Sequence, residues 1–224
     1  MKGILSLLKM KARSGKPSDD HTDSVLFSTA FAGQGVDDSM LVPWEARAVE
    51  VGAKRLPTSR GGKLLQGLWA KDKYMAHLDK DAVERMERFF EFAAVPSNRD
   101  VIRQDEYGNF MVVLLTGTIA VDRVQPWGEQ LRLAETRPGD ILGEMSLLDS
   151  GIRFSACTTL TDCEIAVLSA EAMDDMMTKD PQLAASLIAL LARKLSLRLR
   201  AVSASLSARD ARENRQPREP RPAH

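Results

Sequence analysis

Between residues 100 and 168 the sequence is divided into short apolar runs, and this pattern limits the possible folds most. The runs are DVIRQ, NFMVVLLTGTIAVDRV, EQLRLAET, FSACTTL and CEIAVL, which are rich in Val, Ile, Leu and Thr. They are separated by Gly108-Asn109, Thr116-Gly117, Trp127-Gly128, Pro138-Gly139-Asp140 and Thr161-Asp162. Many short strands at regular turn spacing predict an all-β sandwich or barrel of the jelly-roll kind.

Helical periods flank these strands. KDAVERMERFFEF, residues 80–92, has apolar residues at steps of three and four, and Asp79 stands in the N-cap position. After residue 170 the period returns as a short helix over 170–178, followed by Asp180-Pro181 and a long helix to about Ser205. Its apolar stripe consists of Leu187, Leu191, Leu195, Leu199, Val202 and Leu206. The fold class is therefore mainly β with flanking α-helices.

Composition divides the chain into three parts. The composition of residues 1–72 predicts a partly ordered extension with short helices around 43–47. Trp44 and Trp69 are expected to pin it to a surface. Residues 73–206 form the predicted folded domain, and 207–224 read as a disordered Arg/Pro-rich tail. Within the extension, residues 1–13 have a short apolar side, which we interpret as a frayed terminus rather than a membrane-contacting helix.

Bulk properties exclude several classes of protein. The 224 residues carry a formal net charge of zero, so no whole-chain field attracts nucleic acid or membrane. No apolar run approaches the length that spans a bilayer, and two cysteines without metal-site spacing predict a reduced, cytoplasmic setting. His21, His77 and His224 are scattered and form no catalytic or metal-binding motif. We therefore expect neither a bound metal nor enzymatic activity.

The loop GEMSLLDSGIRFSA, residues 143–156, is the candidate site. Gly143 allows a close backbone approach, and Met145 to Leu148 can form one helical turn whose free N–H groups favour an anion. Arg153, nine positions after Glu144, can return to the same cavity and meet that anion with a guanidinium. Glu144 would then accept a hydroxyl of the ligand. The alternative is a Glu144–Arg153 salt bridge that only closes the loop.

The segment PGDILGEMSLLDSGIRFSACTTLTDCEIAVL resembles the phosphate-binding cassette of cyclic-nucleotide-binding domains, of the catabolite-activator and protein-kinase-A regulatory-subunit type. The resemblance extends from about Leu78 to Ala201 and implies a β-roll. It implies that Glu144 holds the ribose 2′-hydroxyl and Arg153 the cyclic phosphate. Backbone amides from Gly143 through Met145 to Ser146 would complete the cradle. We call residues 143–156 the cassette loop.

Two positions depart from the family pattern. Phe154 stands where a small or hydroxyl residue usually follows the arginine, and Ser155 comes one residue later, on the other face of a regular strand. Arg198 and Leu199 stand where the catabolite activator uses hydroxyl residues to read adenine. Arg198 would stack on a base or donate to a guanine carbonyl, or it lies on a solvated helix face. The choice between cAMP and cGMP stays open.

The sequence thus predicts a non-catalytic cyclic-nucleotide sensor that signals to a protein partner through helix movement. We expect a homodimer through the helix 182–206. Only about 20 residues follow that helix, too few for a helix-turn-helix, so sequence-specific DNA binding is not expected. One alternative is a ligand-free interaction scaffold in which Phe154 fills the phosphate site. A weaker one is a Crp/Fnr-like transcriptional regulator without its own DNA-binding domain.

Overall fold

The computed structural model describes residues 26–75, 78 and 80–213. The predicted segment 1–13, the proposed cap Asp79, the three histidines and residues 214–224 lie outside this range. The helices are α1 (Ala30–Gly33), the 3-10 helix η1 (Asp38–Met40), α2 (Trp44–Val51), α3 (Thr58–Trp69), α4 (Lys80–Glu87), α5 (Glu144–Asp149), α6 (Ala170–Lys179) and α7 (Pro181–Glu213). The strands are β1 (Lys54–Arg55), β2 (Glu91–Val95), β3 (Asp100–Ile102), β4 (Phe110–Thr116), β5 (Ile119–Val124), β6 (Gln130–Glu135), β7 (Ile141–Leu142), β8 (Ala156–Thr159) and β9 (Cys163–Ser169).

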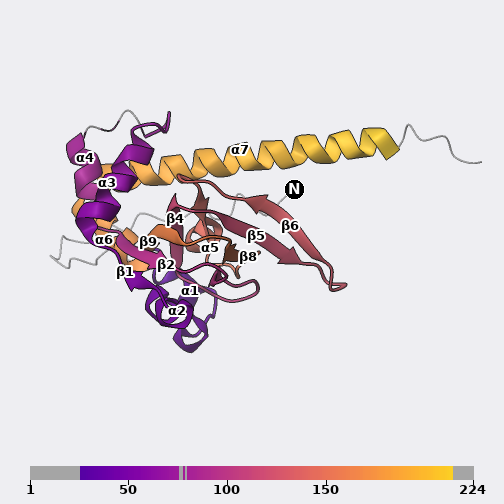
Figure 1. The fold of residues 1–224 in the computed structure, drawn as a ribbon, viewed down its shortest axis with the longest axis horizontal. Coiled ribbons are helices and arrows are strands. Elements are labelled where there is room, and N and C mark those ends of the chain that lie inside the picture. The colour runs from indigo at the N-terminus through magenta and orange to yellow at the C-terminus, as the bar shows by residue number, and fades with distance from the viewer. Residues whose placement is uncertain (1–25, 76–77, 79, 214–224) are drawn as a thin grey trace, which may run out of the picture.

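The strands form two antiparallel sheets that face each other (Figure 1). One sheet has the order β1-β2-β9-β4-β7 and the other the order β3-β8-β5-β6. Alternate residues of β4 point to opposite sides, and all but the last are buried. Val112 and Leu114 pack in the core between the sheets, whereas Met111 and Val113 pack on the helical side. The predicted mainly β architecture is confirmed.

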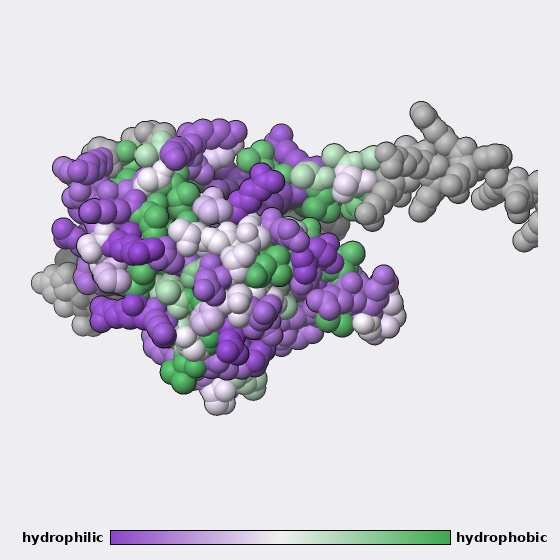
Figure 2. Space-filling model, in the orientation of Figure 1, coloured by the Kyte–Doolittle hydropathy of each residue, from purple (hydrophilic) through white to green (hydrophobic). Residues whose placement is uncertain are grey.

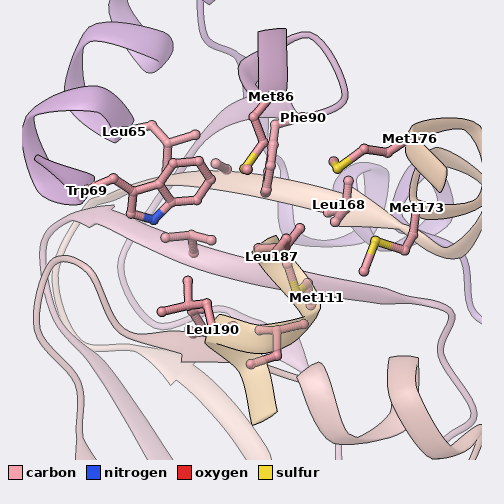
Figure 3. Packing of buried hydrophobic residues seen from close by; sticks show 14 of the residues in the cluster. Leu65, Trp69, Met86, Phe90, Met111, Leu168, Met173, Met176, Leu187 and Leu190 are labelled. Atoms are coloured by element: carbon pink, nitrogen blue, oxygen red, sulfur yellow. The ribbon is translucent and has the colours of Figure 1, made fainter. Parts of the chain in front are cut away.

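A second core lies between the five-stranded sheet and the helices α3, α4, α6 and α7. Figure 3 shows Trp69 and Leu65 of α3, Met86 of α4 and Phe90 meeting side chains of the other helices. The rings of Trp69 and Phe90 pack edge to face, with their centroids 5.7 Å apart. This core fixes the start of α7 against the sheet.

The helix α7 runs along the body and then projects beyond it (Figure 1). Leu187 and Leu191 are fully buried, but Leu199, Val202 and Leu206 on the same predicted stripe are 67%, 54% and 54% exposed. Figure 2 shows hydrophobic surface along this projecting part. The helix also continues to Glu213, so residues 207–213 are helical and not part of a disordered tail. No helix within the described ranges has the length and apolar character needed to cross a membrane.

The predicted helix over 80–92 is too long at its C-terminal end. Helix α4 ends at Glu87, and strand β2 begins at Glu91. Phe90 and Phe92 fit a helical period and a two-residue period equally well, so the local pattern is ambiguous. Pairing of β2 with β9 and with β1 decides for the strand.

Residues 26–72 pack against the rest of the fold. Trp44 and Trp69 are 4% and 2% exposed, in agreement with their predicted role as anchors. The buried carboxylate of Asp174 on α6 accepts hydrogen bonds from the backbone amides of Leu26, Phe27 and Ser28. Helix α3 contributes side chains to the helical core, and strand β1 is the edge strand of the five-stranded sheet. The segment is therefore an integral part of the structure that the model describes.

We expect the Trp69→Ala variant to lose about 3–5 kcal/mol of unfolding free energy, because it opens a large cavity in the helical core. Chemical denaturation followed by circular dichroism measures this loss. Trp127→Ala is the matched control, since that side chain is 72% exposed. The control should stay within about 0.5 kcal/mol of wild type. Equal stability of the two variants would contradict the packing of α3.

Candidate functional site

The cassette loop connects β7 to β8 and contains the short helix α5. Gly143 precedes α5 with φ 75°, a left-handed conformation that favours glycine. A Cβ atom at this position would lie 2.6 Å from Nη1 of Arg153. Ser146 is buried, whereas Met145 is 46% exposed. The predicted single helical turn is confirmed, and its glycine is required by both conformation and space.

Arg153 is directed into the protein core and is 3% exposed. Its Nη1 donates to the carbonyl of Gly143 at 2.7 Å, and its Nη2 donates to the carbonyl of Phe110 at 2.6 Å. The guanidinium also lies over the Phe110 ring, 4.7 Å from the centroid. Arg153 thereby ties the end of the cassette loop to its beginning and to strand β4.

Burial lowers the pKa of Arg153 to about 10, because desolvation penalises the charged form. The group stays cationic at neutral pH. The backbone around it is also held, since the Arg153 amide donates to the Glu106 carbonyl at 2.8 Å. The Asp105 amide donates to the Arg153 carbonyl at 2.9 Å. The loop before β4 therefore fixes the position of this arginine.

Helix α2 supports the same region from the other side. Trp44 packs edge to face on Phe110, with ring centroids 5.6 Å apart. Arg47 is 1% exposed and forms ion pairs with Glu50 and with Glu106. The segment that the sequence predicts as an extension therefore contacts the residues that surround Arg153.

Glu144 is 3% exposed, and its carboxylate is paired with Arg198 of α7. Nη2 of Arg198 donates to the carbonyl of Ile141 at 2.8 Å. The alternative reading, a salt bridge between Glu144 and Arg153, does not form between these two described side chains; Glu144 takes its partner from the long helix instead. Arg198 thus reaches the cassette loop, although its side chain is 48% exposed.

Phe154 is 51% exposed and does not fill a buried cavity, as the scaffold alternative requires. The guanidinium of Arg123 on β5 stacks on its ring, 4.0 Å from the centroid. Arg123 also donates a hydrogen bond to the Phe154 carbonyl. Ser155 follows as a partly buried residue before β8. The structure therefore places a second arginine at the end of the cassette loop.

The structure brings Arg198 to Glu144, and it joins the two ends of the cassette loop through Arg153 and Gly143. Sequence reasoning missed Arg123, because its contact with Phe154 joins residues 31 positions apart on different strands. It also missed Phe110, whose carbonyl and ring both hold Arg153. Asp122 and Arg123 interrupt the apolar run of β5, and that interruption is the signal by which Arg123 can be found.

Both cysteines are unpaired and buried. Burial raises the pKa of the Cys157 thiol to about 12, so it is protonated and unreactive at neutral pH. Burial also raises the pKa of Cys163. Among the described residues, no group of three or more His, Cys, Asp or Glu side chains is placed to hold a metal ion.

Residues 93–180 match the family model described as "Cyclic nucleotide-binding domain". The cyclic AMP receptor protein of Thermus thermophilus is 31% identical over 107 residues, which are 48% of this chain and 50% of that protein. A CRP-like cAMP-activated global transcriptional regulator of Mycobacterium tuberculosis is 28% identical over 100 residues, which are 45% of each chain. The chain thus spans about half the length of the curated relatives it matches.

Solved structures agree with this match. A cyclic nucleotide-binding domain from Methylobacillus flagellatus superposes with a TM-score of 0.65 at 21% identity. That match covers 70% of this chain and 89% of the other. The Thermus thermophilus catabolite activator protein superposes with a TM-score of 0.51 at 28% identity, covering 58% of this chain and 62% of the other. The sheet arrangement is therefore the β-roll that the sequence predicts.

The close fit around Arg153 can be tested at Gly108. A Cβ atom there would lie 2.7 Å from Nη2 and 2.8 Å from Nε of Arg153. We expect Gly108→Ala to lower the unfolding free energy by about 1–3 kcal/mol, because the guanidinium cannot move without breaking its hydrogen bonds. Urea denaturation measures the change.

The control for this experiment is Gly67→Ala in α3, where a Cβ atom meets nothing within 4 Å. Alanine should leave stability unchanged or raise it by up to about 1 kcal/mol, since it favours helix more than glycine does. If Gly108→Ala is as stable as this control, the guanidinium is not held as described.

Proposed function

We propose that the protein, whose residues 93–180 match the cyclic nucleotide-binding domain model, is a non-catalytic sensor in which a cyclic nucleotide competes with Arg198 for Glu144. The ion pair between Glu144 and Arg198 carries this proposal, because it joins the cassette loop to α7. A ligand that takes the carboxylate releases the long helix. Binding is thereby converted into movement of α7.

The carboxylate of Glu144 is suited to a ligand hydroxyl. It is almost fully buried, and a buried carboxylate is stable only with a partner that donates hydrogen bonds. Arg198 is that partner here, but its own side chain is 48% exposed. An exposed arginine is hydrated by water when it is displaced. Replacing Arg198 by a ribose hydroxyl therefore costs less free energy than displacing a buried arginine would.

Release of Arg198 affects α7 because this side chain holds the helix to the body beyond its buried part. The fully buried leucines of the helix end at Leu191. Beyond Lys194, Arg198 is the described side chain of α7 that donates hydrogen bonds to another element. Its acceptors are the Glu144 carboxylate and the Ile141 carbonyl. Loss of the Glu144 partner therefore weakens the outermost attachment of the helix and changes the surface offered to a protein partner.

We expect calorimetry to detect binding of cAMP or cGMP, with cyclic di-GMP titrated in parallel. Glu144→Gln should lower the affinity about ten- to a hundredfold, because a hydrogen bond to a charged group is lost. Arg198→Ala should raise the affinity by about two- to tenfold, because it removes the competitor of a half-exposed ion pair. The opposite signs of the two changes distinguish competition from simple damage to the site.

Arg200→Ala is the matched control, because Arg200 is the next exposed arginine of α7. It should bind the nucleotide as wild type does. Lower affinity in Arg198→Ala would show that Arg198 contacts the ligand rather than competes with it. Absence of heat with every nucleotide at millimolar concentration would overturn the sensor and favour the ligand-free scaffold. One observation favours that alternative, namely that protein groups already satisfy both Glu144 and Arg153.

We further propose that the protein is a cytoplasmic homodimer formed through residues 182–206. Leu199, Val202 and Leu206 follow at steps of three and four and are exposed, which suits a two-helix seam. Light scattering should give twice the chain mass of 24.7 kDa. The double variant Leu199→Lys, Val202→Lys should give a single chain mass, since two charges in the seam oppose burial.

Val49→Lys is the control for the dimer, because Val49 is 84% exposed on α2 and lies outside the seam. It should remain dimeric. A wild-type protein of single chain mass at the concentrations of the binding assay would contradict the dimer and leave the sensor proposal in place.

A further inference from the structure

The protein encloses the guanidinium of Arg153 and engages both of its terminal nitrogens in the present arrangement. Both Nη atoms already donate to backbone carbonyls, at 2.7 and 2.6 Å. The side chain is 3% exposed and lies over the ring of Phe110. To grip a phosphate, it would have to leave two buried carbonyls without their donors and move past a tightly fitted backbone. Its geometry is that of a residue that holds the cassette loop in shape.

Arg123 is in the opposite situation. Its side chain is partly exposed and its guanidinium lies over the Phe154 ring, with the Cζ atom 4.0 Å from the ring centroid. Within the described part of the chain, its hydrogen bond goes to the carbonyl of Phe154. A guanidinium has five N–H donors in one plane, so a stacked arginine with one carbonyl partner keeps donors along its edge.

Arg123 also stands at the right end of the loop. Phe154 follows Arg153, whose side chain is bonded to Gly143, the residue before Glu144. The start and the end of the cassette loop are thereby held together. A ligand that places a hydroxyl on Glu144 therefore extends toward the segment where Arg123 meets Phe154.

We propose that Arg123, held by stacking on Phe154, receives the anionic phosphate of the cyclic nucleotide in place of Arg153. This inference rests on the proposed function, because it concerns the second end of the same ligand. Phe154 then has a positive role. Its ring orients the guanidinium, and its carbonyl takes one donor so that the remaining edge faces the ligand. Arg153 acts as a positioning residue that shapes the loop.

The test compares a charged ligand with its uncharged part. The full chain and its Arg123→Gln variant are each titrated with cAMP and cGMP, and with adenosine and guanosine, which lack the phosphate. In wild type the cyclic nucleotide should bind more tightly than its nucleoside. In Arg123→Gln the affinity for the cyclic nucleotide should fall about ten- to a hundredfold, whereas that for the nucleoside should stay within about twofold. Arg88→Gln removes one exposed charge after α4 and should change neither affinity.

The outcomes separate the two proposals. If Arg123→Gln binds cyclic nucleotide as wild type does, the phosphate assignment is overturned and the sensor stands. If the variant loses affinity for nucleotide and nucleoside equally, Arg123 acts only through the shape of the site, and the assignment is again overturned. If wild type binds no cyclic nucleotide, both proposals fail. Phe154→Leu should give a smaller loss in the same direction as Arg123→Gln, because the arginine is then less well oriented.

Discussion

The hydrogen bonds of Arg153 hold the cassette loop in its shape. One buried guanidinium links the carbonyls of Gly143 and Phe110, and so connects the loop before α5, strand β4 and the start of β8. A buried charge is tolerated because its donors are satisfied and an aromatic ring lies beneath it. Glycine fits at positions 108 and 143 because the guanidinium of Arg153 occupies the space that a side chain there would need. The position of Glu144 depends on this arrangement.

Strand content and helix order could be predicted from the sequence, because turn residues punctuate residues 100–168 and the helical period returns after 170. The end of α4 could not, since Phe90 and Phe92 satisfy two periods and only pairing with β9 chooses between them. The C-terminal end of α7 is equally ambiguous in the sequence, because Arg and Glu after Leu206 suit a helix as well as a charged tail. Local propensity is a weak guide wherever a distant partner decides.

The candidate site shows the same division. The residues of the cassette loop could be found because the segment resembles the phosphate-binding cassette; the spacing of Glu144 and Arg153 alone is weak evidence. Their partners could not, because Glu144 pairs with a residue 54 positions away and Phe154 with one 31 positions away. Whether an arginine faces a ligand or the core is set by the carbonyls that the fold brings within reach. Arg153 and Arg123 are chemically identical, and their surroundings give them different properties.

The length of α7 has a mechanical consequence. The helix has 33 residues, and its fully buried leucines end at Leu191 (Figure 1). At 1.5 Å per residue, the part beyond this point extends about 33 Å. A tilt of about 10° at the buried end then displaces the far end by about 6 Å. The helix therefore acts as a lever arm. A rearrangement of one side chain near the buried end of the helix moves its far end by a distance comparable to the length of a side chain.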